Sequence, residues 1–125
     1  MLTATDVAIY KGGQMEVQNP TGCYIYRGEI EEITVRGSEL RVKFARLAKG
    51  QGYPSFPHRW VRHYDLDLAV NLGIYEVDVH NKRQLCLNSS DVGESIFLFL
   101  PDDGNKLDFS RVEEPEPDDG GGIEA

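Results

Sequence analysis

Strict alternation of apolar and polar residues is the feature that most constrains how this chain can fold. Apolar side chains occupy every second position at Leu66, Leu68, Val70, Leu72 and Ile74. Successive side chains of a strand point to opposite faces, so this period of two predicts a half-buried β-strand over residues 66–74. Residues 40–44 alternate in the same way, with Arg41 and Lys43 on the solvent side.

The other apolar runs are short and are separated by turn-forming residues. Strands are predicted over residues 7–10, 15–17, 23–35, 59–64, 77–79, 85–87 and 96–100, and a short 3₁₀ turn over 107–112 that covers one end of a barrel. A hairpin turn is predicted at residues 36–39, and a long loop at residues 49–57, which contain two glycines and two prolines. The alternation changes phase near Glu31 and Glu32, which predicts a β-bulge or a sharp bend.

Strands joined by short turns, with bends in the long ones, predict an all-β protein. We expect a small, strongly bent antiparallel barrel, SH3-like or similar, formed by residues 1–112 as a single domain. Residues 113–125, EEPEPDDGGGIEA, offer almost nothing to bury, and we expect a disordered acidic tail. A chain of 125 residues is long enough to fold without a metal or a disulfide.

Two features of the chain bear on its location. No apolar run approaches the roughly 20 residues of a membrane span, and the first ten residues lack the pattern of a secretory signal. We therefore expect a cytoplasmic protein with no membrane partner. In a reducing compartment, Cys23 and Cys86 are predicted to be free, buried thiols.

Charge is distributed unevenly along the chain. The formal net charge is −8, which by itself argues against binding to nucleic acid. Residues 40–64, however, contain six basic residues and no acidic one, where the average composition of the chain would supply about four acids.

Aromatic residues are interleaved with these cations. The predicted binding residues are Arg41, Lys43, Arg46, Lys49, Tyr53, Phe56, Arg59 and Arg62. Cations neutralise phosphates and aromatic rings stack on unpaired bases. Segment 41–64 therefore predicts a non-enzymatic binding module for a phosphate-bearing or acidic macromolecule, with single-stranded nucleic acid as one candidate. Alternatively, the cations pair with the acids at 29–32 and 65–67, and Phe44, Trp60 and Tyr64 belong to the core.

A second group of residues could support metal binding or acid–base chemistry: His58, His63, Asp65 and Asp67. Residues 63, 65 and 67 share one face of an extended strand. Because Leu66 and Leu68 are predicted to point inward, that face is predicted to lie in solvent. We therefore expect that the protein is not an enzyme and that it holds no metal and no cofactor.

A third pattern is Asn88-x-Ser90-x-x-Gly93. Its spacing resembles the second half of the motif of PilZ domains, which are β-barrels of similar length that bind cyclic dinucleotides. Arg59 and Arg62 lie upstream, but their spacing is one residue shorter than in the Arg-x-x-x-Arg of that family. The resemblance implies a cyclic-dinucleotide binder as an alternative function. The structural alternative is a polar turn whose side chains bond the local backbone.

Two further hypotheses concern protein partners. The Pro- and aromatic-rich loop 53–60 could be buried against another protein, and sheet edges could pair between subunits, which would make this a protein-interaction or self-assembly module. The acidic tail could compete with an acidic partner for the cations of residues 41–62, because a flexible tether keeps it at a high effective concentration.

Overall fold

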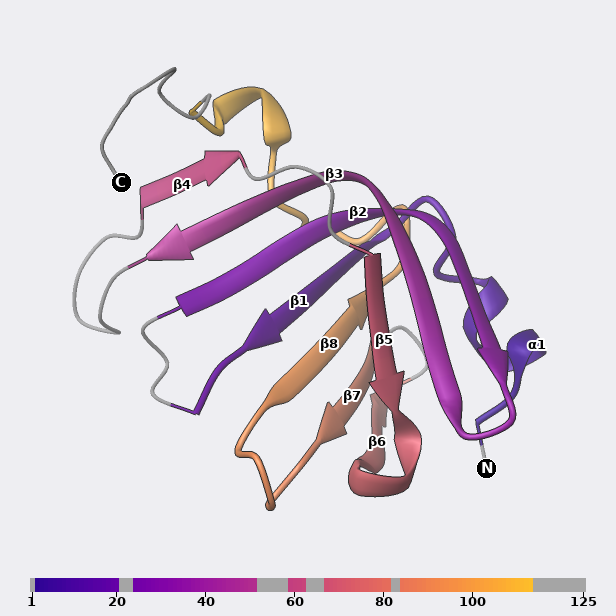
Figure 1. Cartoon of the computed structure of the whole chain (residues 1–125). Coiled ribbons are helices and arrows are strands. Elements are labelled where there is room, and N and C mark those ends of the chain that lie inside the picture. The colour runs from indigo at the N-terminus through magenta and orange to yellow at the C-terminus, as the bar shows by residue number, and fades with distance from the viewer. Residues whose placement is uncertain (1, 21–23, 52–58, 63–66, 82–83, 114–125) are drawn as a thin grey trace.

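The computed structural model describes residues 2–20, 24–51, 59–62, 67–81 and 84–113 (Figure 1). These residues form one short helix, eight strands and two 3₁₀ turns: α1 Ala4–Ala8, β1 Gln14–Gln18, β2 Tyr24–Arg36, β3 Glu39–Gln51, β4 Arg59–Arg62, β5 Asp67–Asn71, η1 Leu72–Ile74, β6 Glu76–Asn81, β7 Gln84–Asn88, β8 Ser95–Phe99 and η2 Phe109–Arg111. All the strands belong to one antiparallel sheet of order β4-β3-β2-β1-β8-β7-β6, with β5 paired to β3. The prediction of an all-β protein is confirmed.

The long strands β2 and β3 bend together and set the shape of the sheet. Their pairing shifts register between Glu29 and Ile30 and again between Ile30 and Glu32, which confirms the predicted bulge. Gly28 lies beside this bend, and a Cβ atom there would overlap with the ring of Phe44. The bend therefore depends on a residue without a side chain, because the aromatic ring fills that space.

The bend divides β3 into two halves with different neighbours. Along one edge β3 pairs with β2 throughout. Along its other edge residues 39–43 pair with β5, and residues 48–51 pair with β4. The sheet thus folds over itself, and its inner face encloses the main core.

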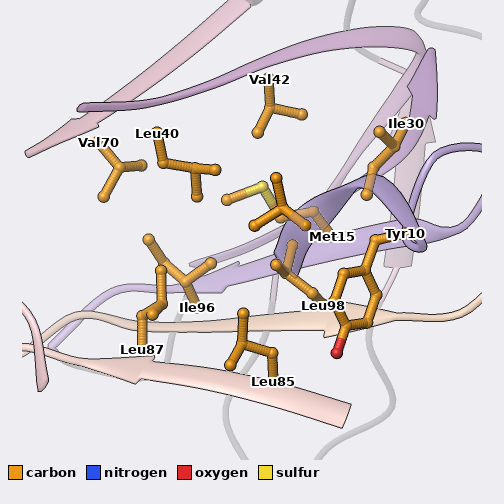
Figure 2. Packing of buried hydrophobic residues seen from close by; sticks show 11 residues of the cluster. Tyr10, Met15, Ile30, Leu40, Val42, Val70, Leu85, Leu87, Ile96 and Leu98 are labelled. Atoms are coloured by element: carbon orange, nitrogen blue, oxygen red, sulfur yellow. The ribbon is translucent and has the colours of Figure 1, made fainter. Parts of the chain in front are cut away.

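The main core lies between two parts of the sheet (Figure 2). One part is the second half of β2 with the first half of β3 and with β5, and the other is β1, β8 and β7. Leu40 and Val42 point inward from β3, as their alternation predicts, and meet side chains of β8 and β7 such as Ile96 and Leu87. Strand β8 pairs with β1 on one side and β7 on the other, which confirms the prediction of a central strand at 96–100.

The outer face of the sheet is covered in part by residues 100–113, here called the strap. The side-chain amide of Gln14 on β1 donates to the carbonyl of Leu107 and accepts from its N–H, both at 2.8 Å. Further on, Phe109 packs against Ala48 of β3, and together with Val112 they form a second, smaller core. Figure 1 shows η2 beside β4, at the end of the molecule away from α1.

A buried arginine joins the strap to the sheet. Arg27, which is 8% exposed, forms a two-pronged ion pair with Glu16 and donates to Gln14 and to the carbonyl of Asn105, both at 3.2 Å. Its guanidinium also lies 4.3 Å from the ring centre of Phe99. Buried charge is tolerated here because it is paired and hydrogen-bonded.

The predicted first strand is wrong: residues 4–8 form helix α1. Thr3 caps the helix, because its hydroxyl accepts from the Asp6 N–H at 3.2 Å and the Asp6 carboxylate accepts from the Thr3 N–H at 2.8 Å. This reciprocal capping stabilises a helix start and is encoded by the spacing Thr-x-x-Asp. Val7 and Tyr10 are nevertheless buried, as members of the core.

Two other boundaries differ from the prediction. Strand β3 continues to residue 51, since Gly50 serves as a close-packing position under the ring of Trp60 rather than as a loop residue. The described part of the alternating run 66–74 is a strand from 67 to 71 and then a 3₁₀ turn, because Asn71 caps that turn by accepting from the Gly73 N–H at 2.9 Å. Similarly, η2 confirms the predicted 3₁₀ turn but lies on the outer face of the sheet.

Within the described residues, no backbone pairing joins β6 to β5 or β4, so these strands form an open sheet. The loop 53–58 and most of the acidic tail, residues 114–125, lie outside the described residues. No helix in the described part of the chain is long and apolar enough to cross a membrane.

Candidate functional site

The register of β3 determines which of the predicted cations share a face. The core side chains Leu40 and Val42 point to the inner face of the sheet. The side chains of Arg41 and Lys43, at the alternate positions, therefore point to the outer face. The bulge in β2 and β3 keeps Arg46 on that face too, whereas Lys49 lies on the inner face with Tyr26, whose ring centre is 5.8 Å from its Nζ.

The remaining predicted residues divide between β4 and the loop before it. Arg62 lies on the outer face of β4, level with Ala48. The backbone of Arg59 is in β4, but its side chain lies outside the described part, as do Tyr53 and Phe56.

The strap uses two of the outer cations. Arg46 holds Glu29 in a two-pronged ion pair at 2.7 and 3.1 Å, and its guanidinium lies 5.0 Å from the ring centre of Phe109. The bond to Glu29 raises the pKa of Arg46 above its ordinary value. The Arg62 guanidinium donates to the Phe109 carbonyl at 3.1 Å. These two side chains therefore act in packing the strap.

Beyond the strap, the outer face is hollowed. A groove of about 510 Å³, here called the outer groove, is lined by Lys11, Glu32, Ile33, Thr34, Arg36, Arg41, Val42, Lys43, Asp67, Leu68 and Ala69. It lies over the first half of β3 with its neighbours β2 and β5. Four of the lining side chains are cationic and two are carboxylates. The lining is thus basic in a chain whose net charge is −8.

The pairing register explains why the groove is hollow around Arg41. Its neighbour in β2 is Thr34 and its neighbour in β5 is Ala69, both with small side chains. Side chains directly opposite each other on neighbouring strands are about 5 Å apart, so small residues on both sides leave open space beside the guanidinium. The hydroxyl of Thr34 adds a hydrogen-bond donor to the same row.

Two of the groove cations form ion pairs in solvent. Arg41 lies 3.4 Å from Glu39, with the two side chains 58% and 45% exposed. Lys43 lies 3.3 Å from Glu31 and is also exposed, and the hydrogen bond with Glu31 raises the pKa of Lys43 above its ordinary value. Exposed pairs of this kind contribute little to stability and exchange readily with other ions.

The other two groove cations, Lys11 and Arg36, were not among the predicted site residues. Neither makes an ion pair with any residue that the structure describes. Arg36 precedes the hairpin turn and lies outside the acid-free segment. Lys11 is brought to the groove by the adjacent turn, where the Gly12 N–H donates to the Ile30 carbonyl at 2.9 Å. No local sequence signal reports such a long-range contact.

The predicted His and Asp group is described only at Asp67. That carboxylate is exposed, and its backbone position is opposite Lys43, at the groove. His58, His63 and Asp65 lie outside the described residues. Among the residues that are described, no three His, Cys, Asp or Glu side chains lie together so as to hold a metal ion.

The loop that resembles the PilZ motif forms a compact turn. Asn88 accepts from the Ser95 hydroxyl at 3.0 Å, and the Gly93 N–H donates to the Ser89 carbonyl at 2.8 Å, with a φ of +70° at Gly93 that favours glycine. Three strands of the sheet, β3, β2 and β1, separate this turn between β7 and β8 from Arg62 on β4. The structure does not bring the Arg position and the turn together.

Of the two cysteines, only Cys86 lies in the described part. It is buried on β7, as predicted, and burial raises the pKa of its thiol. A raised pKa keeps the thiol protonated, which is typical of a structural cysteine.

Comparison of the chain with protein-family models, with curated protein sequences and with solved structures gives no significant match.

Proposed function

We propose that this protein is a non-enzymatic binding module that holds phosphate or carboxylate groups of a macromolecular partner in the outer groove. The observation that carries the proposal is the lining of the groove, where four cations face two carboxylates in an otherwise acidic protein. A local excess of positive charge attracts anions even when the whole molecule is negative.

Arg36 and Arg41 are the central residues of this proposal. Arg36 pairs with Glu39 across the hairpin, so Arg41 is its diagonal neighbour on the same face, about 7 Å away. Two guanidinium groups at this separation can donate several hydrogen bonds to one phosphate, and charge-assisted bonds of this type are the strong ones. The weak pair between Arg41 and Glu39 would yield to such a ligand.

The chemistry of the groove favours recognition by charge over recognition by stacking. None of the described residues that line it is aromatic. A single-stranded nucleic acid would need stacking rings, which Tyr53 and Phe56 would have to supply from outside the described residues. The proposal therefore centres on phosphate-bearing or acidic groups, with single-stranded nucleic acid as one possible source of phosphates.

Self-assembly is a second candidate, and one observation favours it. In the part of the chain that the structure describes, the outer edge of β6 carries no further strand. Next to that edge, Ile74 and Val77 are 40% and 46% exposed. An open edge beside apolar side chains is a template for pairing with another chain. This candidate predicts a dimer that Val77→Lys dissociates, measured by light scattering.

The finer architecture also belongs to this proposal. We regard the bent sheet as a small barrel, SH3-like or similar, with β5 and β6 on either side of its open seam, in a cytoplasmic protein. The bulged strands β2 and β3 and the core enclosed between the two halves support a barrel.

Binding of inorganic polyphosphate tests the function. We expect the double variant Arg36→Glu/Arg41→Glu to bind at least about tenfold more weakly than the unaltered protein at low salt. The affinity should fall with salt with a log–log slope no steeper than about −3, from ~0.7 per phosphate contact and four cations. Arg111→Glu, which reverses an exposed charge on η2 outside the groove, is the matched control and should have little effect. Equal affinity of both variants would refute the proposal.

A further inference from the structure

We propose that the acidic C-terminal segment of this chain, residues 114–125, docks in the outer groove and competes there with an external anionic ligand. The inference rests on the groove assigned above as the binding site, and it adds an intramolecular occupant. Three observations carry it: the direction in which the chain leaves the sheet, the length of the segment and its charge.

The direction is fixed at the last described residue. Glu113 is bound to the outer edge of β4, because its N–H donates to the Trp60 carbonyl at 3.1 Å and its carbonyl accepts from the Arg62 N–H at 2.8 Å. This bridge at Val61 is parallel, so the chain at Glu113 runs in the same direction as β4.

That direction leads toward the groove. Strand β4 is antiparallel to β3, and its course from Arg59 to Arg62 follows β3 backwards from residue 51 to residue 48. Continued further, the same course passes along the edge of β3 that β5 occupies opposite residues 43 to 39. Of those residues, Arg41, Val42 and Lys43 line the outer groove. The chain therefore leaves the sheet pointing at the groove cations.

The length of the segment is sufficient. Lys49 of β3 is level with Val61, and Arg41 lies eight residues away along the strand, about 26 Å at roughly 3.3 Å per residue. Twelve residues extend to about 37 Å at ~3.1 Å per residue, so Glu124 can reach Arg41. Asp119, the sixth residue after Glu113, extends to about 19 Å, which is close to the level of Lys43. Pro115 and Pro117 favour an extended backbone in the residues before them, which suits a straight course.

The charge of the segment is complementary to that of the groove. Five acidic residues and no basic one occur after Glu113: Glu114, Glu116, Asp118, Asp119 and Glu124. The groove presents Lys11 and Arg36, which have no ion pair among the described residues, and the weakly paired Arg41 and Lys43. A tethered segment acts at an effective concentration near the millimolar range, so weak individual contacts suffice.

The consequence is a threshold for binding. A segment docked two-thirds of the time leaves one-third of the grooves open and weakens the apparent affinity for a ligand about threefold. Ligands with a higher charge density than carboxylates displace it more easily, so the segment would select for polyphosphorylated partners over acidic ones.

The test uses the full-length protein and a full-length variant in which the five acids are replaced by amides: Glu114→Gln, Glu116→Gln, Asp118→Asn, Asp119→Asn and Glu124→Gln. We expect the backbone amide resonances of Thr34, Arg41 and Ala69 to differ between the two proteins at low salt. The difference should vanish in ~0.5 M salt, because screening then acts over only a few ångströms. The variant should also bind inorganic polyphosphate about threefold more tightly.

A control variant, Glu76→Gln/Asp91→Asn, removes exposed negative charge away from the groove and should leave these resonances unchanged. Groove resonances that do not respond to the amide variant would overturn the docking, whether or not polyphosphate binds. Resonances that respond while polyphosphate binds neither protein would support the docking and refute the proposed function. The two proposals thus fail separately.

Discussion

The outer face of the sheet has a covered half and an open half, and the two use the same residue types differently. In the covered half Arg27 is 8% exposed and reaches a carboxylate, an amide, a backbone carbonyl and an aromatic ring. In the open half the Arg41 side chain is 58% exposed and meets one carboxylate at 3.4 Å. The strap makes this difference, because it removes water from one half only.

The cations of the basic segment are divided between the covered half and the open half. Arg46 and Arg62 belong to the same acid-free segment as Arg41 and Lys43, yet they hold the strap. A cation in a basic run is available to a partner only where nothing in the chain already covers it. The candidate site is therefore smaller than the run and extends beyond it, to Lys11 and Arg36.

The largest expected effect comes from removing the buried arginine. Arg27→Ala leaves the carboxylate of Glu16 without its partner under the strap, and breaking such a buried pair costs about 3–5 kcal/mol of unfolding free energy. Arg41→Ala, its counterpart in the open half, should change stability by less than about 0.5 kcal/mol. Urea denaturation of both variants measures this. Similar losses of unfolding free energy in Arg27→Ala and Arg41→Ala would show that arginines of the covered half stabilise the fold no more than those of the open half.

The boundary between the halves gives the next effect. Gly28→Ala places a methyl group where the Phe44 ring lies, and overpacking of this kind costs about 1–3 kcal/mol. Gly104→Ala is the matched control, since nothing lies within 4 Å of a Cβ atom there and its φ is ordinary. Thermal unfolding should separate the two variants. A Gly28→Ala protein as stable as the control would show that the bend does not need this space.

A smaller difference is expected between the coupling energies of two ion pairs, one from each half. The two-pronged pair Arg46–Glu29, beside Phe109, should show a coupling energy of about 1 kcal/mol in a double-mutant cycle. The pair Arg41–Glu39 should show a few tenths of a kcal/mol, because it is single and more exposed. Raising the salt concentration should reduce both. A larger coupling in the open half would reverse the comparison.

The smallest effect is a pH dependence at the end of the strap. The Ser110 hydroxyl donates to the Asp108 carboxylate at 2.7 Å and its N–H donates at 3.0 Å, and these bonds hold the pKa of Asp108 below 3.8. Because the pKa of Asp108 is lower in the folded state than in the unfolded state, its ionised carboxylate stabilises the fold above about pH 3.8. This stabilisation is lost as the pH falls through the pKa of Asp108 in the folded state.

Titration of the Asp108 carboxyl carbon by NMR measures this pKa. Ser110→Ala should move the midpoint up toward 3.8, whereas Ser90→Ala, in the distant turn between β7 and β8, should leave it in place. A midpoint that does not respond to Ser110→Ala would assign the shift to another cause.

Much of the fold followed from local sequence. The bulge near Glu31, the hairpin turn after Arg36 and the inward direction of Leu40 are properties of residues close together in the chain. The signal for helix α1 is also local, since Thr3 and Asp6 form a capping pattern, but the apolar residues at 7–10 predict a strand in the same place.

The alternation of strands and the outward direction of Arg41 and Lys43 are encoded locally, because side-chain periodicity is set within a few residues. Which cations are covered depends on the tertiary structure. The strap contacts Gln14 from 93 positions away and Arg27 from 78 positions away. Contacts over such separations depend on the whole path of the chain, and no local pattern of charge can report them.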